Sequence, residues 1–307
     1  MKSLNLTFLL LSVIAGSVSY AQSLVALHHN GTVQHFSGAN ALVNAYAASS
    51  NGDSIYLPWG SFVPPPNFDK SLTMYGAGHY QDSTQATGKS FIGGIVTLNE
   101  NADNFHMEGI EVLDAFNFSA NASVNQVTIK YCKINGPFQV LGNLTNPSNN
   151  IALIGNVIVG DVVLSNASNV AIYNSILQGH LTNSVANLFY NCIFLFNGGN
   201  YDWVINGEMV NNNLYNSVFY QSAWGQYTNI TGNTYKYNIF TSATPNFGTG
   251  AVSENNYFGI AQGSIFINQT GNGFDYTHNY HLQLPLTYLG SDGSQLGLYG
   301  GYFPYKE

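Results

Sequence analysis

Carboxylates are the residues of this sequence with the most obvious capacity for chemistry, and they are densest in the stretch MEGIEVLDA. This stretch contains Glu108, Glu111 and Asp114. Three closely spaced carboxylates could bind a metal ion such as Ca²⁺ or exchange protons with a substrate. Most Asp and Glu side chains, however, are solvated. We therefore favour three outward-facing or loop carboxylates over a metal site.

A second pair of carboxylates, Asp202 and Glu208, lies in the long stretch FNGGNYDWVINGEMVNNN. Two carboxylates facing each other could act as the acid and the base of a glycosidase. Long polar loops also carry solvated carboxylates without any such role. We favour the second interpretation and keep the pair as weak catalytic candidates.

Aromatic residues in the same region give a stronger indication of function. Tyr201 and Trp203 fall in this stretch, and Trp224 and Tyr227 fall in the next long one. Flat rings suit sugars, because a sugar ring presents an apolar face with a polar rim. The alternative is that the rings pack onto their own loops. We predict that these four residues form a polysaccharide-binding flank.

The composition excludes several classes of function. The chain has 307 residues, 45% hydrophobic and 14% aromatic, so it can bury a sizeable core. Its seven basic residues are all lysines, and its net charge is -8. Nucleic-acid binding needs a basic surface, and none is expected here. We also expect no cofactor and a monomer.

The N-terminus is typical of a secretory signal peptide. Lys2 precedes the apolar run LTFLLLSVIAG, and small residues precede a cleavage site between Ala21 and Gln22. We expect residues 1–21 to be removed and the mature protein to be secreted, periplasmic or bound at the cell surface. No later apolar run is long enough to predict a membrane span.

A repeated motif indicates how the chain would position such residues. YNSIL begins at Tyr173, YNCIF at Tyr190 and YNSVF at Tyr215. The last apolar position of the motif recurs at intervals of 17 to 25 residues, at Ile134, Ile158, Leu177, Phe194, Phe219, Phe240 and Phe258. Such a period indicates a solenoid, and the alternation of apolar and polar residues favours strands. Leucine-rich repeats fit poorly, because they require fixed spacing and mostly leucine.

The sequence therefore predicts an all-β, single-stranded parallel β-helix that forms one domain over residues 22–307. We expect a short capping helix within residues 37–52 and a Gly-rich cap over the last rung within residues 276–307. The Ile and Phe column should stack inside. Two positions before each residue of that column lies a small polar column, which contains only Asn, Ser or Cys. Cys132 and Cys192 share this small polar column, three coils and roughly 14 Å apart, which is too far for a disulfide.

Residues 50–260 resemble the right-handed parallel β-helix superfamily, also called pectin-lyase-like. GDSIYLPWGSF is similar to the entry strand of its exported bacterial members, and SLTMYGAGHY is similar to their next rung. SDGSQLGLYGG resembles the ending of β-helix proteins from Bacteroidetes-type bacteria. The resemblance implies a right-handed coil. Enzymes of this superfamily cleave acidic polysaccharides, with an Arg or Lys base and Ca²⁺ or with paired Asp.

These catalytic residues cannot be carried over to this chain. It contains no Arg and no Asp-Asp pair, and Lys130, Lys133 and Lys236 lie beside no carboxylate cluster in the sequence. We predict an exported protein that binds or organises polysaccharide without catalysis. The alternatives are a polysaccharide lyase or glycoside hydrolase with divergent catalytic residues, using Ca²⁺ if a lyase, and a structural or adhesive surface protein.

Overall fold

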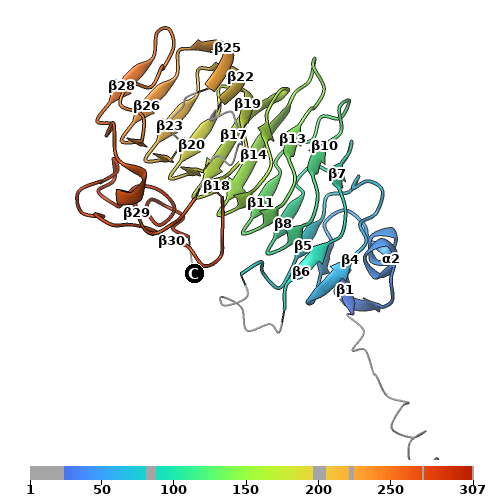
Figure 1. Cartoon of the computed structure of the whole chain (residues 1–307). Coiled ribbons are helices and arrows are strands. Elements are labelled where there is room, and N and C mark those ends of the chain that lie inside the picture. Colours follow the sequence, from blue (N-terminus) through green and yellow to red (C-terminus); the bar gives the residue numbers. More distant parts are fainter. Residues whose placement is uncertain (1–23, 81–87, 196–204, 221–224, 272, 306–307) are drawn as a thin grey trace, which may run out of the picture.

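The computed structural model describes residues 24–80, 88–195, 205–220, 225–271 and 273–305. Figure 1 shows an elongated stack of coils that runs from helix α2 (Ala41–Ala48) at one end to strand β28 (Val252–Glu254) at the other. The predicted signal peptide lies outside the described residues.

Three sheets of stacked strands form the walls of the coils. Sheet A contains, in spatial order, β2 (Thr32–Phe36), β1 (Val25–His29), β3 (Ser54–Tyr56), β5 (Thr73–Tyr75), β8 (His106–Glu108), β11 (Thr128–Lys130), β14 (Ser148–Ile154), β17 (Ala167–Tyr173), β20 (Leu188–Tyr190), β23 (Asn213–Tyr215), β26 (Thr234–Lys236) and β28. Sheet B contains β4 (Gly60–Phe62), β6 (Ser90–Ile92), β9 (Glu111–Val112), β12 (Lys133–Ile134), β15 (Val157–Ile158), β18 (Ile176–Leu177), β21 (Ile193–Phe194), β24 (Val218–Phe219) and β27 (Ile239–Phe240). Sheet C contains β7 (Val96–Leu98), β10 (Phe116–Phe118), β13 (Phe138–Val140), β16 (Val162–Val163), β19 (Leu181–Val185), β22 (Ile205–Val210) and β25 (Gly225–Thr231).

Pairing along the stack is parallel from β3 onward, so the predicted parallel β-helix is confirmed. At the N-terminal end, β1 pairs antiparallel with both β2 and β3, an addition that the repeat pattern did not predict. The predicted capping helix is also present as α2, which buries Leu42, Ala45 and Tyr46. It begins after Asn40 and covers the first rungs.

The Phe column lies inside the coil, as predicted, with one correction. The rings of Phe194 and Phe219 stack at 4.4 Å, and those of Phe219 and Phe240 at 4.6 Å. All three side chains are buried. Phe258 continues the stack onto Phe240 at 5.5 Å but is 41% exposed, because it stands on the last rung. It therefore ends the column.

The bend from sheet A to sheet B explains why the motif recurs. In motif after motif the same position has a positive φ, namely at Tyr131, Gly155, Asn174, Asn191, Asn216, Tyr237 and Asn255. Asn and Gly tolerate this left-handed conformation best. The following small polar residue is buried from Cys132 to Asn238, and where it is Asn or Ser its side chain accepts a backbone N–H at the bend of a neighbouring rung. Asn156 Oδ1, for example, accepts the Cys132 N–H at 2.9 Å, and Ser175 Oγ accepts the Asn156 N–H at 3.0 Å.

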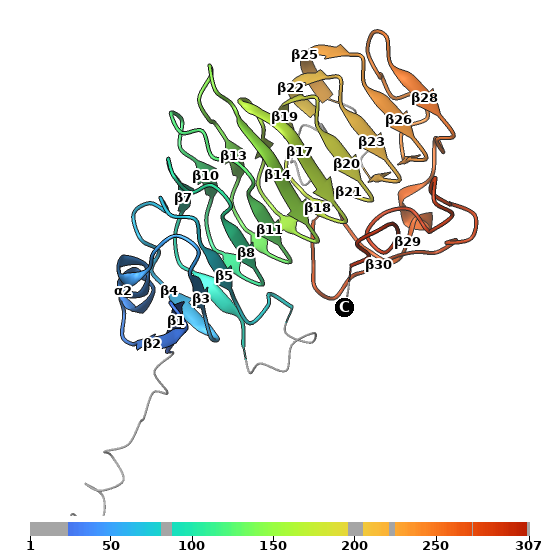
Figure 2. The same cartoon turned by 180° about the vertical axis from the view of Figure 1, so that it is seen from behind.

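The C-terminal segment does not cover the last rung, which corrects the prediction. Residues 262–271 and 273–305, which we call the C-terminal strap, run back along the outer face of sheet B. Figures 1 and 2 show its strands β29 (Phe266–Asn268) and β30 (Asn279–Leu282) beside the stack rather than at its end. A short 3₁₀ helix, Gln262–Ser264, opens the strap.

An apolar outer face on sheet B is the physical reason for this position of the strap. From β15 to β27, each strand puts one residue inside the coil and the other outside, yet both are buried. The outward residues pack against strap side chains such as Phe266, Leu282 and Leu298. The outward residues of these sheet B strands are Val157, Ile176, Ile193, Val218 and Ile239. Covering them removes apolar surface from water, which contributes to folding.

Both cysteines are buried and unpaired, as predicted. Cys132 and Cys192 occupy the small polar position of their rungs, where each Sγ lies near backbone carbonyl groups. Burial raises the pKa of each thiol to about 12. Neither thiol is therefore suited to act as a nucleophile at neutral pH.

Candidate binding site

Tyrosines line up along the outer face of sheet A. The last residue of each strand faces outward, and the strand registers place these residues in one line along the stack. In spatial order the line contains Tyr56, Tyr75, Glu108, Lys130, Ile154, Tyr173, Tyr190, Tyr215, Lys236 and Glu254. We call its five tyrosines the tyrosine column.

Neighbouring rings of the tyrosine column contact each other. Tyr56 and Tyr75 stack with centroids 5.2 Å apart and planes 21° apart. The centre of the Tyr190 ring lies 6.4 Å from that of the Tyr173 ring and 6.3 Å from that of the Tyr215 ring. The column thus presents aromatic surface in two groups, Tyr56 with Tyr75 and Tyr173 to Tyr215, which are separated by Glu108, Lys130 and Ile154.

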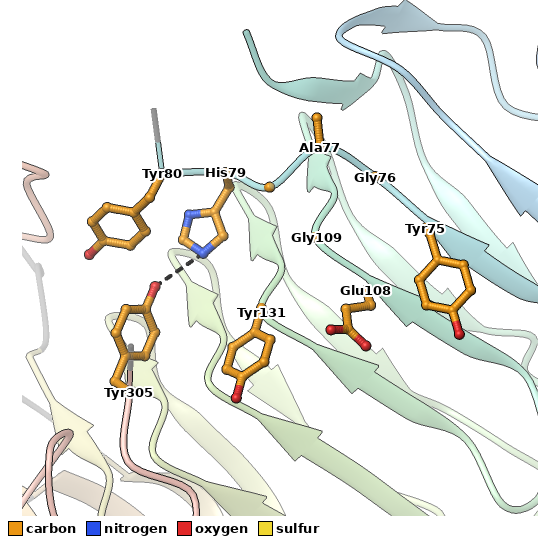
Figure 3. Close-up of a pocket in the computed structure, with 10 residues that line it drawn as sticks. Tyr75, Gly76, Ala77, His79, Tyr80, Glu108, Gly109, Tyr131 and Tyr305 are labelled. Carbon is orange, nitrogen blue, oxygen red and sulfur yellow. Dashed lines mark hydrogen bonds between the residues drawn. The ribbon is translucent and has the colours of Figure 1, made fainter. Parts of the chain in front are cut away.

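A cavity of about 370 Å³ opens next to this interruption, at the bend from sheet A to sheet B. Its lining residues are Tyr75, Gly76, Ala77, Gly78, His79, Tyr80, Glu108, Gly109, Tyr131 and Tyr305. Figure 3 shows the carboxylate of Glu108 between the rings of Tyr75 and Tyr131. The cavity therefore combines aromatic walls with one carboxylate, a combination typical of small-molecule sites.

One side chain on its own strand and one on the adjacent strand hold Glu108 in position. His106 Nε2 lies 3.2 Å from Glu108 Oε2, and Lys130 Nζ lies 3.8 Å from Oε1. The Lys130 ammonium also lies 4.8 Å from the centre of the Tyr131 ring. Lys130 and Glu108 are far apart in the sequence, but parallel pairing of β8 with β11 makes them neighbours.

The strap closes one side of the cavity. Tyr305 Oη and His79 Nε2 are hydrogen-bonded at 3.2 Å, and Tyr276 Oη lies 3.4 Å from His79 Nδ1. The Tyr80 ring packs edge-on against Tyr276 and Tyr305, at 4.9 and 5.6 Å. Burial lowers the pKa of His79 to about 3. His79 is therefore neutral at neutral pH and contacts the strap through hydrogen bonds and ring packing, without an ion pair.

Glu111 faces outward from the coil, as expected, but it is buried, which corrects the expectation of a solvated carboxylate. Its side chain lies under the strap, where Lys133 Nζ is 3.2 Å and Lys89 Nζ 3.5 Å from its oxygens. Asn135 Nδ2 donates to Oε1 at 3.0 Å. Burial favours the neutral acid, but Asn135 and the two lysines outweigh it, so the pKa of Glu111 is lowered.

The carboxylates of MEGIEVLDA do not form one site. Glu108 lies on sheet A, Glu111 lies on sheet B, and Gly109 in the bend separates them. Asp114 is exposed and accepts the Ala115 N–H at 2.8 Å. Among the described residues, no group of three or more His, Cys, Asp or Glu side chains is arranged to hold a metal ion.

Most of the predicted aromatic flank lies outside the described residues, namely Tyr201, Trp203 and Trp224, as does Asp202. The structure places the other two candidates on adjacent strands of sheet C. Tyr227 pairs with Gly207, next to exposed Glu208, whose N–H is bonded to Asn183 Oδ1 at 3.2 Å. The four-residue flank stays a prediction, and the cavity lies at a different corner of the coil.

No protein-family model, curated protein or solved structure matches the chain. The fold and the side chains at the bend are therefore the basis for assigning a function. Within the described residues, no helix is long and apolar enough to cross a membrane.

Sequence reasoning missed the residues that shape the cavity. Part of the signal was present, because three tyrosines of the column, Tyr173, Tyr190 and Tyr215, begin the repeated YN motif and could have been traced from rung to rung. Tyr131 occupies the bend position that Asn fills in other rungs. Nothing in the sequence, by contrast, relates Tyr305 to His79, because the strap brings them together across most of the chain.

Proposed function

We propose that this protein is exported and binds polysaccharide along the outer face of sheet A, without catalysing its cleavage. The observation that carries the proposal is the cavity at the interruption of the tyrosine column, with Glu108 between Tyr75 and Tyr131. Tyrosine rings stack on sugar faces, and a carboxylate accepts hydrogen bonds from sugar hydroxyls. Two groups of rings along the same face, Tyr56 with Tyr75 and Tyr173 to Tyr215, match an extended polymer better than a single small molecule.

Binding of this kind depends on stacking and hydrogen bonds, so we expect it to be insensitive to salt. It requires no cofactor, and a chelator of divalent cations should leave it unchanged. The protein acts as a monomer in this proposal. The catalytic alternatives make a different prediction, since a lyase or a hydrolase would release new chain ends from the same polysaccharides.

Affinity gel electrophoresis against a panel of polysaccharides tests the proposal. Tyr131→Asn removes one wall of the cavity but keeps a residue that suits the left-handed bend, as at Asn174 in a later rung. We expect this variant to lose most of its retention with an unchanged melting temperature. Tyr75→Ala should act in the same direction.

Tyr237→Asn is the matched control, because Tyr237 has the same positive φ on a rung remote from the cavity. The Tyr237→Asn variant should be retained by the polysaccharide gel as strongly as the unaltered protein. The proposal fails if no polysaccharide retards the protein, or if Tyr131→Asn and Tyr237→Asn behave alike. Retardation without release of chain ends would also separate binding from catalysis.

Export is the second part of the proposal, and it has its own test. The segment that supports it is the apolar run after Lys2, followed by small residues before Gln22. We expect the N-terminus of the mature protein to be Gln22 when the full chain is expressed in a secreting bacterial host. An intact Met1 in the extracellular or periplasmic fraction would contradict cleavage.

A further inference from the structure

The charges around the cavity indicate which polysaccharides it can accept. Glu108 is the one carboxylate among the described lining residues, and no Lys is among them. His79 also lines the cavity, but burial lowers its pKa to about 3, so it carries no charge at neutral pH. The other lining residues are Tyr, Gly and Ala. The described lining therefore offers no cation to a negatively charged ligand.

An ionised carboxylate can accept hydrogen bonds but cannot donate them. Glu108 therefore matches a sugar hydroxyl, which donates, and conflicts with a uronate or a sulfate, which accepts and carries the same charge. Two negative charges a few ångströms apart repel each other most strongly where water is partly excluded. The net charge of -8 on the whole chain opposes the approach of a polyanion as well.

Lys130 does not reverse this preference while Glu108 is present. Its ammonium lies 3.8 Å from the Glu108 carboxylate and 4.8 Å from the centre of the Tyr131 ring. Its charge is thus directed to groups of the protein itself. It also disfavours a cationic amino sugar, because an incoming ammonium would compete with it for the same carboxylate.

We infer that the cavity accepts an uncharged, hydroxyl-bearing sugar unit and rejects units that carry a uronate or a sulfate. This inference rests on the proposed polysaccharide binding and names the substrate class of the same site. It separates this chain from the enzymes of the fold it resembles, which act on acidic polysaccharides.

The test uses pairs of polysaccharides that differ at one substituent, a carboxylate in the acidic parent and an uncharged hydroxymethyl group in the reduced form. Polygalacturonate and alginate are each compared with their carboxyl-reduced forms in affinity gels, together with a neutral β-glucan and a galactomannan. We expect retention by at least one neutral polymer and at least about tenfold weaker binding to each acidic parent than to its reduced form. The measurement is repeated at high salt, where the discrimination should decrease because charge repulsion is screened.

Glu108→Gln assigns the discrimination to one residue. The amide keeps the size of the side chain, removes its charge and leaves Lys130 without its partner. We expect binding of the neutral polymer to weaken roughly tenfold, because a charged acceptor is lost, and the discrimination against the acidic parents to disappear.

Glu254→Gln is the matched control. Glu254 is also paired with a lysine, since its Oε2 lies 2.8 Å from Lys236 Nζ, and it occupies the same outward line two rungs beyond Tyr215. The Glu254→Gln substitution removes the same charge from the chain. It should change neither the binding of the neutral polymer nor the discrimination against the acidic polymers. If both variants lose discrimination equally, net charge and not the cavity is responsible, and the inference is overturned.

The outcomes separate the inference from the proposed function. If no polymer is retained, polysaccharide binding itself is wrong. If polygalacturonate or alginate binds as well as its reduced form, binding stands but the inference of an uncharged ligand is wrong. An unchanged preference in Glu108→Gln, with an unchanged melting temperature, also overturns it.

Discussion

Asn174 donates its side-chain amide to the carbonyl oxygens of Leu298 and Gly300, at 2.8 and 2.7 Å, and so fixes the C-terminal strap to the bend of one rung. Two further bend asparagines hold the strap in the same way. Asn191 Nδ2 donates to the Gly297 carbonyl at 3.0 Å. Asn216 Oδ1 accepts an N–H from the strap at 3.0 Å. The Asn of the repeated motif therefore has two roles, because it permits the left-handed bend and binds the strap.

Asn174→Gly separates these two roles. Glycine keeps the positive φ of 44° but removes both hydrogen bonds to the strap. We expect a loss of roughly 1–3 kcal/mol in the free energy of unfolding, with faster hydrogen exchange in residues 288–305. Asn255→Gly is the control, since Asn255 has the same conformation at an exposed position. Equal effects of the two substitutions would mean that the hydrogen bonds to the strap contribute nothing.

Phe219→Ala tests the internal aromatic stack. Phe219 lies between Phe194 and Phe240 and is buried, so truncation leaves a cavity that rigid neighbouring rungs cannot fill. We expect a loss of about 3–5 kcal/mol, measured by urea unfolding. Phe258→Ala should cost clearly less, because Phe258 stands on the last rung and is partly exposed. A loss below about 0.5 kcal/mol for Phe219→Ala would be a surface-like effect and would contradict the observed stack.

The two thiols should be unreactive in the folded protein. Cys132 and Cys192 are fully buried, and burial raises the pKa of both thiols to about 12. A thiol reagent added at neutral pH should therefore modify neither residue until the protein is unfolded, and should then modify both. Mass spectrometry of the labelled peptides provides the measurement. Labelling of either thiol at a rate independent of unfolding would disprove its burial.

Acidification should weaken the attachment of the strap through His79. Burial lowers the pKa of His79 to about 3, whereas an unfolded histidine titrates near about 6.5. Between these values the unfolded chain binds more protons than the folded protein, so stability falls as pH decreases. The expected slope is at most about 1.4 kcal/mol per pH unit, measured by urea unfolding between about pH 8 and about pH 5.

His79→Gln supplies the control for this slope, because glutamine can hydrogen-bond to the strap but does not titrate. The variant should be less dependent on pH over the same interval, whatever its stability at neutral pH. Parallel pH profiles for the variant and the unaltered protein would show that His79 does not link acidity to folding. Glu111 acts in the same direction at lower pH, since its lowered pKa contributes stability that is present above an unfolded value of about 4.3 and is lost as pH falls further.

The sequence was sufficient to predict the coil, because the strands and bends of each rung depend on residues that are close together in the sequence. Alternation around Ile172 indicates a strand, the recurrence of Phe194 and Phe219 indicates stacking, and the shared column of Cys132 and Cys192 excludes a disulfide. Each rung repeats the same bend, so an aligned motif contains the register from one rung to the next. The internal columns and the capping helix could therefore be derived without coordinates.

The position of the strap and the composition of the cavity were decided by the tertiary structure. Apolar pairs such as Ile193 with Phe194 contain the information that both faces of sheet B are buried, but they do not identify what covers the outer face. Residues beyond 260 lack the repeat, so no alignment predicts where they pack. Tyr305 reaches His79, and Lys130 reaches Glu108, through packing between distant segments and between rungs. A local sequence pattern determines the repeating coil. Contacts that do not repeat depend on how the surfaces of distant segments fit together, and only the tertiary structure shows this.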